Sequence, residues 1–451
     1  MAIARVTGRD ETSGPAPMAI SPGVDQPPRP TGAQIVEGRY LVPFILITSL
    51  FLSWAFAASL NDVLIRHFQA ALDLTRGQSS LIQLAFYIGY FCAALPAGLV
   101  IRKFGYKGGI LVGLALYAAG AFAFYPAAEV RSYAAFLAAL YVIAVGLAFL
   151  ETSANPYVAL LGDPSTGSAR LNLAQSAYGL GAIAGPIVGG MLILTSVELT
   201  PRQLQAMSPQ VLEAFRSATA ATVQKPYLCI GLAVCVLAVI ISFTRFPPLD
   251  GAAASSVSRL ASPFRVLRHR RLRWAIVAEF FYVGAQVGVW SFFIDFCKDV
   301  MPALHQQRIA YLLSGSLATL MVGRFTGAFI QRRVRPASHL ALYAAINVLL
   351  CLAAAYAGGG VAIAALWCTS FFMSIMFPTI FALGVEDLGP EAELASSFLI
   401  MSIIGGALIP PAMGLIADRI GGAQHIMVVP AFCFAVCLLF ALRLPPTGTR
   451  S

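Results

Sequence analysis

Charged side chains are scarce in this chain. Asp, Glu, Lys and Arg make up 11% of its 451 residues, 58% are hydrophobic, and the mean hydropathy is +0.78. Soluble globular domains carry about 25% charged residues, and disordered chains carry few large apolar ones. The composition therefore excludes both classes and predicts a polytopic membrane protein.

The chain also lacks the signatures of common enzyme sites. It contains no nucleophile elbow, no phosphate-binding loop and no His or Cys pairs at the spacing of metal ligands. Its five histidines are scattered, and its eight cysteines fall in or beside apolar stretches, where they are typical of small packing residues. We therefore expect neither an enzyme nor a metal or organic cofactor.

Long apolar stretches are abundant instead. A helix needs about 20 apolar residues to cross a hydrocarbon core of about 30 Å. Twelve stretches satisfy this, near residues 42–65, 79–101, 108–128, 133–160, 171–196, 226–246, 274–296, 309–331, 337–357, 361–385, 395–417 and 424–443. The sequence therefore predicts an all-α membrane protein with twelve transmembrane helices.

The proline-containing, basic segment 247–272 divides these spans into two groups of six, and is typical of a cytoplasmic linker. We expect the following divisions: a disordered cytoplasmic tail over 1–38, a six-helix bundle over 39–246, a second bundle over 273–443 and a short cytoplasmic tail over 444–451. Pro156 and Gly162 in the first half reappear at the same spacing as Pro378 and Gly384 in the second. This repetition indicates a duplicated six-helix unit, an arrangement that transporters use.

Lys and Arg concentrate on one side of the predicted spans. If the N-terminus lies in the cytoplasm, the basic clusters at 102–107, 259–273 and 332–335 all lie there too, as the positive-inside rule requires. Both termini are therefore predicted to be cytoplasmic. The net charge of +10 then reflects topology and contact with anionic lipid rather than nucleic-acid binding.

Two carboxylates, Asp62 and Glu151, lie deep inside the first and fourth predicted spans. An ionisable group at the centre of a span costs about 2.5–3.5 kcal/mol on insertion scales, so it usually lines a polar cavity or a proton path. The alternative is a carboxylate that reaches water from a helix end. We interpret both residues as candidate proton-binding groups.

Amide side chains accompany these carboxylates. Asn61 precedes Asp62, and Asn155 lies one helical turn after Glu151, so both amides can face the same cavity. The neighbouring Pro156 should disturb the helix and free a carbonyl, and a structural kink is an alternative reason for its presence beside Asn155.

Further hydrogen-bonding residues lie in spans 5 and 7. Asn172 and Gln175 can either bind a hydroxyl-rich ligand or tie helices together. In span 7, Tyr282, Gln286 and Trp290 follow one another at steps of four and form one helical stripe. Aromatic rings alone would indicate packing, but an amide between them favours a carbohydrate site, because sugars present apolar faces to rings and hydroxyls to amides.

At these residues the chain resembles the fucose permease-like branch of the major facilitator superfamily, the fucose/galactose/glucose:proton symporters. The resemblance extends from about residue 40 to 443. It rests on Leu60-Asn61-Asp62, Glu151-Thr152-Ser153-Ala154-Asn155-Pro156-Tyr157, Arg170-Leu171-Asn172-Leu173-Ala174-Gln175, Phe280-Phe281-Tyr282-Val283-Gly284-Ala285-Gln286, Met376-Phe377-Pro378-Thr379 and Ile404-Gly405-Gly406.

The resemblance implies two pseudo-symmetric six-helix bundles around a central cavity, the major facilitator fold. It also implies proton-driven import of a monosaccharide such as L-fucose into a bacterial cell, in the inner membrane and by a monomer in contact with lipid. By motif position, Asp62 and Glu151 become the proton-coupling carboxylates and Gln175 a sugar contact. Arg102 and Lys103 resemble a loosened form of the superfamily's cytoplasmic gate motif, or are a topology signal alone.

One departure from the family bears on the substrate. Ser59 stands where related proteins often carry an asparagine, so glucose, galactose or mannose are also candidate substrates beside L-fucose. The residues are compatible with a uniporter or an exporter as well, and with a sugar sensor that transports nothing.

Overall fold

The protein is described here from a computed structural model of the 451-residue chain. The structure describes residues 34–72, 76–130, 132–192, 222–247 and 263–444, with short pieces at 207–208, 210–211 and 214–215. Inside the helices it leaves out the side chains of 57–58, 60–72, 76–83, 186, 188–192 and 306. Most of the predicted tail 1–38 and of the predicted linker 247–272 therefore lies outside the described residues.

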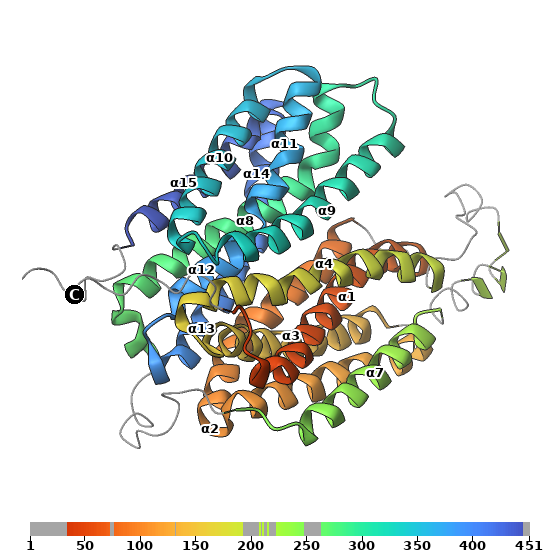
Figure 1. Ribbon diagram of the computed structural model, residues 1–451. Coiled ribbons are helices and arrows are strands. Elements are labelled where there is room, and N and C mark those ends of the chain that lie inside the picture. The colour runs from red at the N-terminus through yellow and green to blue at the C-terminus, as the bar shows by residue number, and fades with distance from the viewer. Residues whose placement is uncertain are drawn as a thin grey trace, which may run out of the picture.

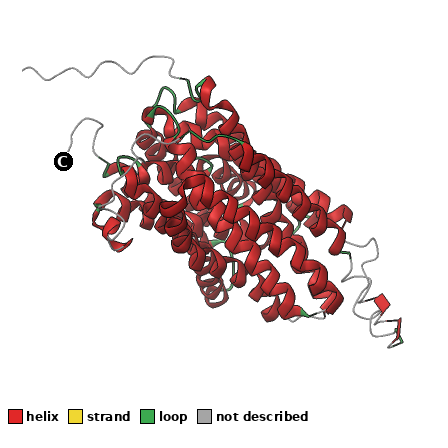
Figure 2. Ribbon diagram, turned by 90° about the horizontal axis from the view of Figure 1, so that it is seen from below, coloured by secondary structure: helices red, strands yellow, loops and turns green. Residues whose placement is uncertain are grey.

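The described part of the chain consists of helices and contains no β-strand (Figure 2). The first half contains α1 (Leu41–Leu72), α2 (Arg76–Val130), α3 (Tyr133–Leu160), α4 (Gly167–Leu192) and α7 (Gln224–Phe243). The second half contains α8 (Arg270–Val300), α9 (Gln306–Ile330), α10 (Pro336–Tyr356), α11 (Gly359–Met373), α12 (Met376–Val385), α13 (Ala392–Met401), α14 (Gly405–Ile420) and α15 (Val428–Leu442). Short 3-10 turns, among them η2 (Pro164–Thr166) and η6 (Ser402–Ile404), connect neighbouring helices.

The helices confirm the predicted all-α membrane fold. Among the described residues, ten helical stretches are long and apolar enough to cross a membrane. One of these, Leu84–Val130, covers both the second and the third predicted span, because left-handed Gly105 (φ 74°) joins two helices within α2. The fifth predicted span coincides with α4, which is not one of the ten.

Two spans of the second half are each built from two helices. The tenth consists of α11 and α12, separated by Ser374 and Ile375. The eleventh consists of α13 and α14, joined through η6. Pro378 lies one turn after the first break, and its missing N–H leaves the Ser374 carbonyl without a helical partner. Pro156 lies inside α3, which continues to Leu160 without a break; because proline has no N–H, it still leaves the Thr152 carbonyl without its helical partner.

The helices gather in two groups (Figure 1). Helices α1–α7 form one group and α8–α15 the other, while α12 and α13 lie against the first. Contacts between the groups join α13 to α2 and α3, α12 to α3 and α4, and α4 to α9. The two groups are therefore packed together along part of their length.

One end of the molecule carries both described chain ends. The Ile35 carbonyl accepts a hydrogen bond from Arg170 at the start of α4, and the Arg443 guanidinium lies 4.2 Å from the centroid of the Trp274 ring at the start of α8. We call this end, where α4 and α8 begin and α9, α12 and α15 end, the terminal end. The contacts of α13 with α2 and of α12 with α4 lie there.

Glycine permits the close approach of the two groups. A Cβ atom on Gly98 of α2 would collide with the Ser397 hydroxyl of α13 and would lie in tight contact, at 3.1 Å, with the Glu393 carbonyl oxygen. Similarly, a Cβ atom on Gly179 of α4 would collide with the Met321 side chain of α9. Because the hydrophobic effect does not drive helices together within lipid, such small-residue contacts are a main source of packing energy there.

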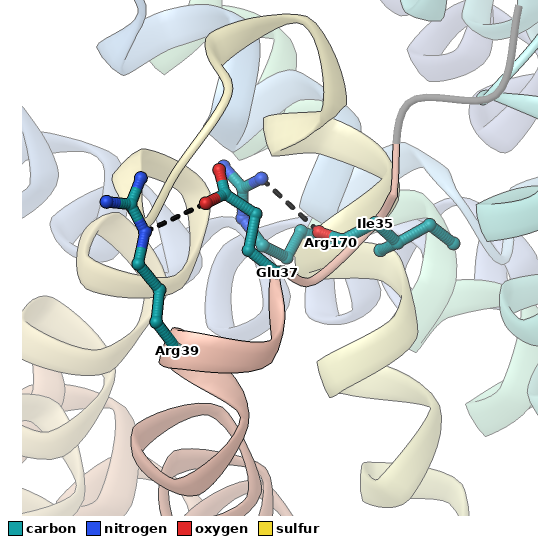
Figure 3. Close-up of polar contacts among 4 residues, drawn as sticks. All are labelled: Ile35, Glu37, Arg39 and Arg170. Atoms are coloured by element: carbon teal, nitrogen blue, oxygen red, sulfur yellow. Dashed lines mark hydrogen bonds and ion pairs between the residues drawn. The ribbon is translucent and has the colours of Figure 1, made fainter.

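Arg170 fixes the N-terminal segment to the terminal end (Figure 3). Its side chain is 1% exposed, and it donates to the carbonyl oxygens of Val158 (2.8 Å), Ala159 (2.7 Å) and Asp163 (3.2 Å). It also donates to the Thr166 hydroxyl at 2.7 Å. A planar guanidinium has five donors and so can satisfy this set of acceptors at the end of α3, which a lysine cannot.

Replacing Arg170 with methionine is expected to destabilise the protein by about 3 kcal/mol or more. The variant leaves several buried carbonyl oxygens without a donor, each at a cost of about 1–3 kcal/mol. Thermal melting of the purified protein in detergent measures the effect. The matched control is Arg39→Met, because Arg39 is exposed and pairs with Glu37 at the surface, so its loss should change stability by less than about 1 kcal/mol. Equal melting temperatures for the two variants would contradict this role of Arg170.

Candidate functional site

Of the two predicted proton-binding carboxylates, Glu151 is the one whose side chain the structure describes. Asn61 and Asp62 belong to α1, but their side chains fall outside the described residues. Glu151 lies on α3, is 9% exposed, and its Oε1 accepts a hydrogen bond of 3.0 Å from the hydroxyl of Tyr90 on α2. The Glu151 carboxylate is therefore shielded from water, and the uncharged Tyr90 hydroxyl donates a hydrogen bond to it.

A buried cation joins the two helix groups close to these residues. Arg324 on α9 is 5% exposed, and its Nε donates to the Ser374 carbonyl at 3.0 Å. This carbonyl is the one that Pro378 frees from the helix, so the proline creates the acceptor that the arginine uses. A second donor of Arg324 reaches the Gln175 carbonyl of α4 at 3.3 Å, and the guanidinium lies 5.5 Å from the centroid of the Tyr178 ring.

Two of the predicted amides bind one another within the first group. The Gln175 amide nitrogen donates to Asn155 Oδ1 at 3.0 Å, which joins α4 to α3. Both side chains are buried, and the Asn155 amide nitrogen has no hydrogen-bond partner. A buried, unpartnered amide donor beside a second amide is an arrangement that a ligand hydroxyl can complete.

Asn172 takes part in a different contact, a polar cluster between the two groups. Its amide nitrogen donates to Gln331 Oε1 (3.0 Å) and to the Thr379 hydroxyl (3.2 Å). Ser168 donates to Gln331 Oε1 at 2.9 Å, and the Gln331 amide nitrogen donates to Thr379 at 2.9 Å. We call these four residues the terminal clamp. All four are at most 5% exposed, so the hydrogen bonds tie α4 to α9 and α12 away from water.

The span 7 stripe lies on α8, and its members differ in burial. Tyr282 is 0% exposed, whereas Gln286 and Trp290 are half-buried. The Trp290 indole donates to the Ser370 hydroxyl at 3.1 Å, which ties α8 to α11. The three residues thus lie along one face of α8, and this face is fully buried at Tyr282.

The predicted gate residues lie in the middle of the long helix α2, at the terminal end of the molecule. Arg102 is half-buried, and its positive charge acts on Glu393 at the start of α13 in the other group. Lys103 is exposed and lies 5.0 Å from the centroid of the neighbouring Phe104 ring. Arg102 therefore places a positive charge at the contact between the two helix groups.

Sequence reasoning missed two members of this region. Nothing in the sequence distinguishes Tyr90 from the other tyrosines, since its contact with Glu151 joins residues 61 positions apart. Glu279, a further buried carboxylate on α8, stands in the same segment as the stripe and was not singled out. Its charge inside an apolar span was the available signal.

No group of three or more His, Cys, Asp or Glu side chains within the described residues is arranged to hold a metal ion. The buried polar side chains of the described residues lie instead around Glu151, around Arg324 and in the terminal clamp. Such an arrangement can bind a proton and a neutral polar ligand, and it joins the two groups of helices.

Known proteins resemble the chain along nearly its whole length. An L-fucose-proton symporter of Escherichia coli strain K12 is 44% identical over 415 residues, which cover 91% of this chain and 95% of that protein. An L-fucose-proton symporter of Haemophilus influenzae is 34% identical and covers 91% of this chain and 98% of its own length. A glucose/galactose transporter of Brucella abortus is 35% identical, with coverages of 88% and 92%.

Solved structures agree with this relationship. A crystal structure of the E. coli fucose:proton symporter matches with a TM-score of 0.83 at 43% identity, over 89% of this chain and 98% of that chain. Another structure of this symporter, described as being in the outward conformation, gives the same values. A proton:xylose symporter matches with a TM-score of 0.68 at 11% identity, which shows a shared fold alone.

The family profile described as Major Facilitator Superfamily matches residues 44–402. Family profile, relatives and solved structures thus agree with the two groups of helices seen here. The chain belongs to the major facilitator superfamily and, within it, to the fucose permease-like family.

Proposed function

We propose that the protein is a proton-coupled symporter that imports a monosaccharide, with L-fucose as the first candidate, by alternating access. The observation that carries this proposal is a buried carboxylate, Glu151, that lies with Arg324 where the two helix groups meet. The relatives at 34–44% identity are named as L-fucose-proton symporters or as a glucose/galactose transporter, rather than as enzymes.

The proposed cycle begins in the conformation described here. With both termini in the cytoplasm of a bacterial inner membrane, the terminal end is the cytoplasmic end, and its closure corresponds to an outward-facing state. A proton and the sugar bind from outside, and loss of the carboxylate charge lowers the cost of occluding the site. The two groups then rock, the terminal clamp opens, and sugar and proton leave to the cytoplasm.

The residues divide into three proposed roles. Asp62 and Glu151 couple the proton to transport, and Arg102 and Lys103 belong to the cytoplasmic gate. The residues proposed to contact the sugar are Asn61, Asn155, Gln175, Tyr282, Gln286 and Trp290. Asn172, which the sequence also suggested as a sugar contact, is better explained in this conformation by its place in the terminal clamp, because its amide nitrogen already has three acceptors.

The remaining expectations are part of the same proposal. The proton is the coupling ion, and no metal or organic cofactor is required for this mechanism. The protein works as a monomer surrounded by lipid and does not bind nucleic acid. Residues 39–246 and 273–443 form the two moving bundles, with 247–272 as their linker.

Uptake of labelled L-fucose, D-galactose, D-glucose and D-mannose into proteoliposomes tests the function. We expect one of these sugars to accumulate only when the outside is more acidic than the inside. Equilibration that ignores the gradient would make the protein a uniporter, and binding without flux would make it a sensor. An exporter would accumulate sugar only under the opposite gradient.

Replacing Gln175 with alanine should weaken binding of the transported sugar by about tenfold. Such a loss corresponds to about 1.4 kcal/mol, close to the value of one hydrogen bond in a shielded site. Equilibrium binding to the purified protein measures it. The control is Gln224→Ala, because Gln224 begins α7 and donates to the Tyr125 carbonyl away from this region. If both variants bind the sugar like the parent protein, Gln175 is not a sugar contact.

A further inference from the structure

Glu279 is a carboxylate in the membrane-spanning part of the second helix group for which the proposed cycle has no role so far. It lies on α8, is 0% exposed, and neither of its carboxylate oxygens has a hydrogen-bond partner. Tyr282, less than one turn further along the same face, is also 0% exposed, and its hydroxyl lies beside the Arg324 guanidinium without a hydrogen bond of ordinary geometry. The two carboxylate oxygens of Glu279 are thus buried without hydrogen bonds, although such atoms are rare in folded proteins.

The charged and titratable groups that face Glu279 come from four helices. Among the described residues they are Tyr282 on α8 itself, Arg324 on α9, Cys437 on α15 and, from the other helix group, Glu151 on α3. Arg324 attracts a negative charge on Glu279, and Glu151 repels it. Helix α12, which also packs against α8, contains no titratable residue.

The one cation among these groups is engaged elsewhere. Arg324 donates to the carbonyl oxygens of Ser374 and Gln175, and no described carboxylate oxygen lies within ion-pair distance of its guanidinium. An ionised carboxylate that is buried without a hydrogen bond or a close cation is so unfavourable that the group takes up a proton instead. In this conformation Glu279 is therefore a neutral carboxylic acid.

Opening of the terminal end changes this balance. The bond from Arg324 to the Gln175 carbonyl crosses between the two helix groups, so their separation leaves one guanidinium N–H without an acceptor. A carboxylate on the neighbouring α8 can then accept that N–H, and because this acceptor is charged whereas the Gln175 carbonyl is neutral, the new hydrogen bond is stronger than the one that was lost. The O–H bond of Glu279 breaks, its electron pair stays on the carboxylate, and the proton passes to water that enters from the opened end.

We propose that Glu279 is a further proton-binding residue of this transporter, which holds a proton while Arg324 bridges the two helix groups and releases it when the bridge opens. The inference rests on the proposed function, since it assumes a cycle between two conformations. It adds a proton site to the second helix group, whereas Asp62 and Glu151 both belong to the first.

Infrared spectroscopy tests the bound proton without any transport. A buried protonated carboxyl group gives a separate carbonyl stretching band, and we expect such a band in the purified sugar-free protein at neutral pH. Glu279→Gln should remove this band, and Glu279→Asp, which keeps a carboxyl group, should retain it with a shifted position. The matched control is Glu129→Gln, because Glu129 is exposed at the end of α2 and should not contribute. An unchanged band in a folded Glu279→Gln protein would overturn the proposal.

Transport by the same variants tests the release of the proton. Each coupled proton supports about tenfold accumulation per pH unit, so with a difference of about one unit Glu279→Gln should accumulate about tenfold less sugar than the parent protein, yet exchange sugar across the membrane within about threefold of the parent rate. Glu279→Asp should recover part of the accumulation. If Glu279→Gln accumulates sugar like the parent protein, the proton on Glu279 is not part of the cycle. If the parent protein itself moves no sugar, the proposed function fails, and the infrared band still decides whether Glu279 holds a proton.

Discussion

Glu151→Gln is expected to lower proton-driven accumulation of sugar by about tenfold per pH unit of gradient while leaving exchange of sugar across the membrane within about threefold of the parent rate. Each pH unit of gradient is worth about 1.36 kcal/mol per proton, so one coupled proton supports about tenfold accumulation per unit. The variant cannot bind or release a proton at this position. Its accumulation of sugar should therefore fall by the factor that this one proton supports.

The amide is a close substitute for the protonated acid. Glutamine keeps an oxygen that can accept the hydrogen bond from Tyr90, so the contact between α3 and α2 survives. Loss of accumulation with intact exchange would therefore report the missing proton rather than a damaged fold. The measurement is uptake of labelled sugar into proteoliposomes with and without a gradient, beside counterflow in the same vesicles. Full accumulation by Glu151→Gln would remove Glu151 from the coupling mechanism.

Gly98→Leu is expected to prevent closure of the terminal end and to reduce uptake by about tenfold or more. The Cβ atom of a side chain at this position collides with the Ser397 hydroxyl and lies in tight contact with the Glu393 carbonyl oxygen of α13. Overpacking of a close contact costs about 1–3 kcal/mol, which shifts the equilibrium between the two conformations by about 5-fold to 150-fold. Since alternating access requires both conformations, the cycle slows even though no ligand contact is altered.

Reactivity of a cysteine introduced at Thr379 reports the position of this equilibrium. Thr379 is 0% exposed in the terminal clamp, so Thr379→Cys should react slowly with a water-soluble thiol reagent in the parent background and faster with Gly98→Leu present. Peptide mass spectrometry separates this site from the eight native cysteines. The matched control is Gly360→Leu, because Gly360 is exposed at the start of α11 and a Cβ there meets no atom within 4 Å. Equal reactivity in all three backgrounds would show that the contact at Gly98 does not control closure.

Much of the fold follows from the sequence because the bilayer restricts it so strongly. Within lipid every backbone N–H and C=O must be satisfied inside the segment, so a long apolar stretch has few alternatives to a helix. This is why the all-α fold was predictable, and why the helix boundaries agree with the spans to within several residues. Proline predicted breaks in the helices less well, since Pro156 lies within a continuous helix whereas Pro378 follows a break.

Candidate site residues could be chosen from the sequence for a related reason. Asp62 and Glu151 are candidates because a carboxylate is costly in an apolar span, and the lone arginine Arg324 in the eighth span carries the same signal. Their partners were not recognisable. Tyr90 looks like any membrane tyrosine, and the carbonyl of Gln175 that Arg324 binds carries no sequence signal at all.

The sequence by itself determined that the chain lies in a membrane, where its helices are and which family it resembles, and it gave the candidate residues for proton and sugar binding. It could do so because a polar group in lipid has its cost wherever it stands in the chain, independently of distant contacts. Only the tertiary structure decided which end of the molecule is closed, that Asn172 lies in the terminal clamp, and that Glu279 is buried without a partner. These features depend on contacts between helices far apart in the chain, and the same sequence forms and breaks them as the two helix groups move.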